Sequence, residues 1–126
     1  MSERQDIVQK YIEGFRRGDR DMILECLTDD VEWNLLGWQS LEGKDRFAGE
    51  IQNDAFVGTP ELTIERMVED QDMVVALGSG SGRLREGGEL EFVFSDVFFF
   101  EGTRIRRLDT YQVNLNAGPQ VTDTGG

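Results

Sequence analysis

The stretch from Glu89 to Leu115 constrains the fold most strongly, because apolar residues alternate over two segments joined by a short turn at 101–103. Strand side chains point to opposite faces with a period of two, so every second residue of a strand shares a face. In the first segment, one face carries Leu90, Phe92, Phe94, Asp96, Phe98 and Phe100. In the second segment, one face carries Ile105, Arg107, Asp109, Tyr111 and Val113. The pattern predicts a β-hairpin in which one carboxyl group, that of Asp96, interrupts an apolar face.

The register of this hairpin decides which side chain lies opposite Asp96. A two-residue loop at 101–102 places Asp96 opposite Arg107, whereas a loop at 102–103 places it opposite Asp109. Burial raises the pKa of a carboxyl group, a neighbouring carboxylate raises it further, and a nearby arginine lowers it. The apolar face predicts a pKa for Asp96 above the usual value of about 3.9. The alternative is that Asp96 lies near a sheet edge, hydrated and paired with an arginine.

Composition excludes several kinds of chemistry. The chain of 126 residues is large enough to bury a core without disulfides or a structural metal. It has no histidine and one cysteine, Cys26, so a Ser-His-Asp triad and an internal disulfide are excluded. No group of carboxylates has the spacing of metal ligands, and we expect neither a metal nor a cofactor. Carboxylates, tyrosines and arginines remain for proton chemistry.

Charge and hydropathy restrict the partners. With 13 basic and 25 acidic residues, the net charge of −12 disfavours nucleic acid and anionic membrane surfaces. No apolar run approaches the 18 or so residues of a membrane-spanning helix, and the N-terminal MSERQD lacks signal-peptide character. We therefore expect a soluble, cytoplasmic protein.

The first half of the chain is predicted to be mainly helical. Ser2 and Gln5 form a capping-box pattern, and apolar residues, among them Tyr11, then recur at helical spacing as far as Phe15. The next expected elements are a short helix that buries residues up to 27, a strand at 31–36, a loop at 37–43, a helix at 44–52 and an irregular connection at 54–60. Strands at 62–70 and 73–85 then precede the hairpin.

This order predicts one α+β domain over residues 1–115, followed by a disordered tail at 116–126. A curved mixed or antiparallel sheet should wrap around the N-terminal helices. Glycines 78, 80 and 82 alternate, so they leave one strand face nearly bare. The opposite face of the hairpin is predicted to carry Val93, Val97, Phe99 and Leu108. Because monomers rarely expose such a face, we expect a homodimer through the outer side of the sheet.

Three segments together resemble a known family: IVQKYIEGFRRGDRDMILECLTDDVEW, GKDRF and SDVFFFEGTRIRRLDTYQV. They are similar to the SnoaL-like branch of the nuclear transport factor 2 and ketosteroid isomerase superfamily. The resemblance implies a cone-shaped α+β barrel with a pocket at its open end, and usually a dimer. The superfamily includes isomerases, cyclases, hydrolases, dehydratases and proteins without catalytic activity, so the resemblance specifies the fold more closely than the function.

The resemblance also implies a site. By motif position, Tyr11 matches the tyrosine on the first helix of the ketosteroid isomerases, and Asp96 matches their protonated aspartate. The position of their catalytic base falls on Leu35, which cannot accept a proton. The arginine and aspartate of related epoxide hydrolases fall within the glycine-rich run at 78–82.

Two functional hypotheses follow. The first is a small-molecule enzyme of isomerase, cyclase, lyase or hydrolase type, acting on an apolar substrate through Asp96 with Tyr11 and Asp109 assisting. Its pocket would be shaped by Trp33, Leu35, Met67, Phe94, Phe98 and Tyr111. The second is a dimeric binding module that holds an apolar ligand in the same pocket without catalysis, and the missing base at Leu35 favours it.

Overall fold

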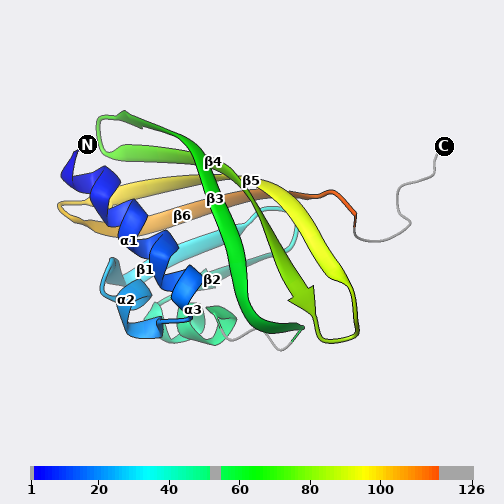
Figure 1. The fold of residues 1–126 in the computed structure, drawn as a ribbon. Coiled ribbons are helices and arrows are strands. Elements are labelled where there is room, and N and C mark those ends of the chain that lie inside the picture. The colour runs from blue at the N-terminus through cyan, green and yellow to red at the C-terminus, as the bar shows by residue number, and fades with distance from the viewer. Residues whose placement is uncertain (1, 52–54, 117–126) are drawn as a thin grey trace.

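The computed structural model describes residues 2–51 and 55–116 (Figure 1). The helices are α1 (Glu3–Arg17), α2 (Arg20–Leu24) and α3 (Lys44–Ile51). The strands are β1 (Leu27–Leu35), β2 (Gln39–Glu42), β3 (Phe56–Asp70), β4 (Met73–Leu84), β5 (Glu89–Glu101) and β6 (Arg104–Asn114). No helix in these residues is long and apolar enough to cross a membrane.

Local sequence explains where α1 begins and ends. The Ser2 hydroxyl accepts a hydrogen bond from the Gln5 amide at 3.1 Å, which satisfies one of the free amides of the first turn. Gly18 ends the helix with φ at +67°, a conformation that glycine adopts without steric cost. The N-terminal helix with its predicted cap is therefore confirmed.

The strands form one mixed six-stranded sheet in the order β2-β1-β6-β5-β4-β3. The pairs from β3 to β6 are antiparallel, whereas β1 runs parallel to β6. The sheet curves around α1, which lies against one of its faces (Figure 1). The expected α+β fold is confirmed, and the sheet stays open, with β2 and β3 at its edges.

The core lies between α1, α3 and the concave face of the sheet. The Tyr11 ring contacts Phe98 edge-on at a centroid distance of 5.3 Å, and Trp33 stacks on Phe47 at 4.3 Å. Phe47 and Phe98 are wholly buried, and burial of such a side chain contributes about 1.5–3 kcal/mol. This aromatic cluster fixes α1 and α3 against the strands that carry Trp33 and Asp96.

Three boundaries differ from the sequence-based prediction. β1 begins at Leu27, which pairs with Ile105 of β6 instead of extending the second helix. The loop expected at 37–43 contains β2, which forms a short hairpin with β1. β3 begins at Phe56, because the segment expected to be irregular pairs with the end of β4 before the register shifts between Val57 and Glu61.

The β5–β6 hairpin has its loop at 102–103 but changes register near the tip. Phe100 pairs with Ile105, whereas Phe99 pairs with Arg107, so Arg106 is an extra residue that forms a β-bulge. A shift of one residue exchanges the faces of a strand. Asp96 consequently lies opposite Thr110, and both predicted partners, Arg107 and Asp109, are wrong.

The bulge also corrects the predicted outer face. Leu108 pairs with Phe98 and is wholly buried, so it belongs to the concave face and not to the outer one. Of the predicted tail, residues 117–126 lie outside the described residues. Asn116 is hydrogen-bonded to β5, donating to the Glu89 carbonyl and accepting from the Glu91 amide.

Candidate functional site

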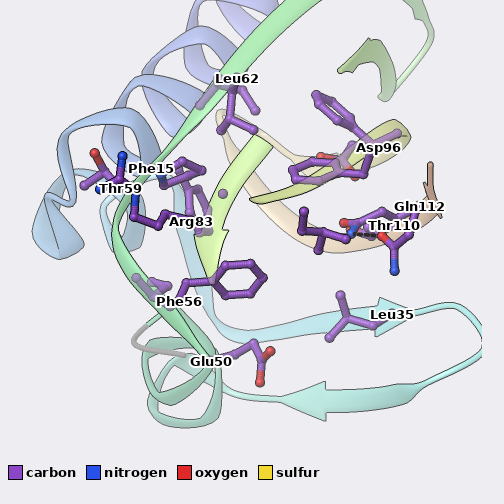
Figure 2. Close-up of a pocket in the computed structure, with 18 of the residues that line it drawn as sticks. Phe15, Leu35, Glu50, Phe56, Thr59, Leu62, Arg83, Asp96, Thr110 and Gln112 are labelled. Carbon is purple, nitrogen blue, oxygen red and sulfur yellow. Dashed lines mark hydrogen bonds between the residues drawn. The ribbon is translucent and has the colours of Figure 1, made fainter. Parts of the chain in front are cut away.

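A cavity of about 490 Å³ opens between α1, α3 and the concave face of the sheet (Figure 2). Most of its wall is apolar. Its aromatic side chains are Tyr11, Phe15, Trp33, Trp38, Phe56, Phe92 and Phe94. Its polar side chains are Glu50, Thr59, Arg83, Asp96, Thr110, Gln112 and Asn114. An apolar wall with a few polar groups is typical of small-molecule sites.

Asp96 is the ionisable group on the β5 wall of this cavity. It is 9% exposed, and its Oδ1 atom has no hydrogen-bond partner among the described residues. Burial raises the pKa of Asp96 to about 7, although a hydrogen bond from the Thr110 side chain lowers it. The raised pKa agrees with the expected direction, but Thr110 is the modulating group, in place of Asp109 or Arg107. Near neutral pH, Asp96 can therefore both accept and donate a proton.

Thr110 is fixed in turn by Trp33. The Trp33 indole Nε1–H donates to the Thr110 hydroxyl oxygen at 2.9 Å, and both side chains are buried. Figure 2 shows Asp96 and Thr110 on the same wall of the pocket, above Leu35. Leu35 pairs with Thr110 through the parallel β1–β6 contact. The position that matches the isomerase base is therefore an apolar part of the wall next to Thr110.

Tyr11 contributes a neutral hydroxyl group from α1. The residue is 2% exposed and lines the cavity. Burial and the nearby charge of Asp96 raise the pKa of the Tyr11 phenol well above its usual value. The phenol consequently keeps its proton at physiological pH and can donate a hydrogen bond to a ligand oxygen.

Glu50 and Arg83 bring charge to other parts of the wall, away from Asp96 and Thr110 (Figure 2). Burial raises the pKa of Glu50, against a hydrogen bond that its Oε1 accepts from Gln39 at 3.1 Å. Arg83 stands opposite Glu89 near the end of β4. The two side chains add charge to a cavity whose wall is mostly apolar.

The bare glycine face of β4 makes room for aromatic rings. A Cβ atom at Gly80 would lie 2.7 Å from the Phe92 ring, and one at Gly82 would lie 3.0 Å from the Phe56 ring. Such distances are shorter than van der Waals contact, so any larger residue would displace these rings. The alternating glycines predicted from the sequence therefore shape the cavity wall.

The structure gathers five of the predicted site residues around this cavity: Tyr11, Trp33, Leu35, Phe94 and Asp96. Phe98 is wholly buried in the core beneath the cavity. Met67 lies in the same cross-strand row as Asp96, with Ala76 between them, but it does not line the cavity.

Asp109 and Tyr111 lie on the opposite side of the sheet, because the bulge at Arg106 turns them away from Asp96. They line a separate hollow beside the β1–β2 turn. Asp109 is buried there and accepts hydrogen bonds from Arg107 at 3.1 Å and from Asn34 at 2.8 Å. Burial alone would raise the pKa of Asp109, but the hydrogen bonds from Arg107 and Asn34 outweigh it and the pKa is lowered. Asp109 is therefore part of a structural network on the outer face.

Several lining residues escaped sequence reasoning, above all Thr110 and Gln112. One signal was present: Ile105 and Leu108 are three residues apart, and no period-two strand can place both on the concave face. Both side chains are wholly buried, because the bulge adds one residue between them and brings them to the same face. Glu50 and Phe56 were missed because they reach the cavity from α3 and from the start of β3.

Comparison with known proteins places this geometry in context. A family model described as a SnoaL-like domain matches residues 8–108. A search of the curated proteins gave no significant match.

Within the described residues, no group of acidic or thiol side chains is arranged to hold a metal ion.

Solved structures share the fold at low sequence identity. A nuclear transport factor 2-like protein of unknown function from Burkholderia pseudomallei has a TM-score of 0.82 at 22% identity, covering 88% of this chain and 91% of that one. An epoxide hydrolase of M. tuberculosis has a TM-score of 0.78 at 21% identity, covering 88% and 83%. A putative SnoaL-like polyketide cyclase from Shewanella putrefaciens has a TM-score of 0.78 at 12% identity, covering 89% and 80%. The TM-scores show a common fold, and at such low identities they show the fold alone.

Proposed function

Because the chain belongs to the SnoaL-like domain family, whose fold binds small molecules, we propose that its cavity holds an apolar ligand on which Asp96 acts as general acid and base. One observation carries the proposal. A buried carboxyl group with a pKa of about 7 faces an aromatic cavity, and one of its oxygens has no partner among the described residues. A buried carboxyl group with an unpaired oxygen costs free energy, which a ligand hydrogen-bonded to the carboxyl group would offset.

The groups around Asp96 suit proton transfer next to a carbonyl group. Ionised Asp96 takes a proton from the carbon, the electron pair of the C–H bond moves toward the carbonyl oxygen, and an enolate forms. The neutral Tyr11 phenol donates a hydrogen bond to that oxygen. The protonated carboxyl group then returns the proton to another carbon of the enolate, which completes an isomerisation. In a cyclisation, the enolate carbon first attacks a second carbonyl carbon of the ligand, the C=O electron pair moves to that oxygen, and the proton goes to the alkoxide. One residue with a pKa near 7 can serve in both directions.

The solved relatives support this class of reaction only as analogies. One is described as a putative polyketide cyclase and another as an epoxide hydrolase. The bare glycine face at 78–82 leaves no side chains there for the arginine and aspartate of the epoxide hydrolases, which favours carbonyl chemistry over epoxide opening.

The second candidate is a binding module that holds an apolar ligand unchanged. Leu35 favours it, because the position of the isomerase base is an apolar wall residue and Asp96 has no second carboxylate near it on β1. In that case the carboxyl group of Asp96 would contribute affinity and orientation only. For either function we propose a homodimer formed through the outer face of the sheet.

Hydrogen exchange of a small ketone distinguishes the two functions. 2-Tetralone is an apolar bicyclic ketone whose C1 hydrogens exchange with D2O through the enol, and it is small enough for the cavity. An acid-base enzyme should accelerate this exchange, measured by NMR, and Asp96→Asn should abolish the acceleration. If the ketone binds, its exchange stays at the buffer rate, and Asp96→Asn changes only affinity, the protein is a binding module.

A further inference from the structure

Trp33 and Thr110 form a buried pair next to Asp96 that takes no part in the proposed proton transfer. The Thr110 hydroxyl group has one proton to donate and lone pairs with which to accept. Trp33 Nε1–H donates to the hydroxyl oxygen at 2.9 Å, and the indole nitrogen can only donate. The direction of this hydrogen bond is therefore fixed, and the Thr110 proton is left free to point elsewhere.

Sheet register supplies the acceptor for that proton. Asp96 and Thr110 are direct cross-strand partners on the concave face, and the Thr110 side chain is the hydrogen-bonding group of the Asp96 carboxyl. Trp33, Thr110 and Asp96 thus form a directed chain that runs from β1 through β6 to β5.

We propose that Trp33 and Thr110 are positioning residues for Asp96: the indole holds the Thr110 hydroxyl so that its proton points to the Asp96 carboxyl group and fixes that group in the cavity wall. The inference rests on the proposed function, because a positioning role requires that Asp96 acts on a ligand. The contacts among Trp33, Thr110 and Asp96 do not depend on turnover. Trp33 is itself held by stacking on Phe47, so the chain starts in the rigid core.

This arrangement suits both protonation states of Asp96. The Thr110 hydroxyl group donates a hydrogen bond to the carboxyl group whether it is ionised or neutral. Asp96 is therefore held in one orientation while it takes the proton from the carbon of the ligand and while it returns it.

Few other groups can control the titration of Asp96. Tyr11 from α1 is the titratable side chain whose charge state interacts with it, and the phenol stays neutral at physiological pH. From β4 the cross-strand neighbour is Ala76, and from β1 the adjacent wall residue is Leu35. Glu50 on α3 and Arg83 on β4 line the same cavity but are not among the causes of the Asp96 shift.

Carboxyl NMR on the full chain tests the inference without a substrate. The Asp96 resonance, assigned by its loss in Asp96→Asn, is titrated in four variants. In Thr110→Val, loss of the hydrogen bond to the anion should raise the pKa of Asp96 by about one pH unit. Thr110→Ser keeps the hydroxyl and should restore the wild-type value. Trp33→Phe should raise the pKa by a smaller amount, because the hydroxyl becomes free to rotate away from Asp96.

Thr63→Val is the matched control, since it makes the same change at an exposed position of β3 and should leave the Asp96 titration unchanged. An unchanged or lowered pKa in Thr110→Val would overturn the inference, as would an unchanged pKa in Trp33→Phe. If Thr110→Val does not fold, Thr110→Ser and Trp33→Phe still decide the outcome. A failed ketone-exchange assay together with the expected NMR shifts would reject the enzymatic function and keep the positioning role.

Discussion

At the scale of single residues, Asp96 and Asp109 are two buried carboxyl groups with opposite environments. Asp96 faces an aromatic cavity and has its pKa raised to about 7 by burial, whereas Asp109 accepts hydrogen bonds from Arg107 and Asn34 and has its pKa lowered. Both lie on the same strand pair, and the bulge at Arg106 assigns one to each face. Their effects on stability should therefore depend on pH in opposite directions.

Asp96 should lower the stability of the fold at alkaline pH. Its folded pKa lies above the ordinary 3.8, so the folded state binds more protons between the two values. The contribution of Asp96 is most favourable below pH 4 and is lost as the pH rises through 7, by an amount on the order of a few kcal/mol. Asp96→Asn should raise the free energy of unfolding at pH 8, measured by urea denaturation, and the gain should shrink at pH 5.5. Equal gains at both pH values would contradict the raised pKa.

Asp109 should stabilise the fold at neutral pH. Its pKa is lowered, so the stabilisation is complete above the ordinary value and is lost as the pH falls through the folded one. Asp109→Asn removes a charged acceptor from Arg107 and should cost about 1–3 kcal/mol at pH 7, measured by urea denaturation. Because Asp109 faces away from the cavity, tetralone exchange per folded molecule should not change. A loss of exchange without a loss of stability would show that Asp109 takes part in the exchange reaction.

At the scale of secondary-structure elements, alternation predicted the strands more reliably than their register. The capped helix α1, the glycine face of β4 and the apolar face of β5 follow directly from the sequence pattern. The bulge at Arg106 does not, because inserting one residue into β6 leaves the alternation intact on both sides of it. Thr110 was therefore missed and Asp109 was misplaced, although the Ile105–Leu108 spacing contained the signal.

The glycine face also gives a prediction for β4. A Cβ atom at Gly78 would lie 2.2 Å from the Thr63 carbonyl oxygen and 2.8 Å from the Phe94 ring, so β3 would have to move. Gly78→Ala should destabilise the fold by about 1–3 kcal/mol or more, measured by urea denaturation. Gly49→Ala is the matched control, because no atom lies within 4 Å of its added Cβ and alanine favours helix α3 by up to about 1 kcal/mol. If the two variants were equally stable, β3 would be able to move away from the added Cβ atom without a loss of folding free energy.

At the scale of the whole molecule, the outer face of the sheet carries an apolar patch formed by cross-strand rows. One row joins Val68, Val75 and Val97, and the next joins Leu77, Ser95 and Tyr111. Leu77, Val93 and Tyr111 are 37%, 39% and 49% exposed. In the described residues α1 covers only the concave side, so this patch has no helix over it. The exposed apolar patch favours association with a second copy through the same face, against the mutual repulsion of two chains that each carry a net charge of −12.

The choice of substitutions follows from the packing of this face. Phe99 lies on it, but Arg106 and Arg107 stack over its ring at 5.8 and 5.2 Å, so changing Phe99 would disturb the single chain as well. Leu77→Glu combined with Val93→Glu alters two positions that are more exposed than Phe99. At a two-fold interface these carboxylates would be buried near their symmetry mates, and unpaired buried like charges cost several kcal/mol. The double variant should therefore be monomeric.

Light scattering coupled to size-exclusion chromatography measures the outcome. The wild type should have twice the mass of the 14.3 kDa chain, and the double variant should have the mass of one chain. Arg20→Glu lowers the net charge by the same two units at an exposed position of α2 and should remain dimeric, which separates interface burial from general repulsion. A double variant that stays dimeric would assign the contact to another surface, and a monomeric wild type would leave the patch exposed. Because α1 holds Tyr11 on the concave side, the monomer should keep the Asp96 titration of the wild type.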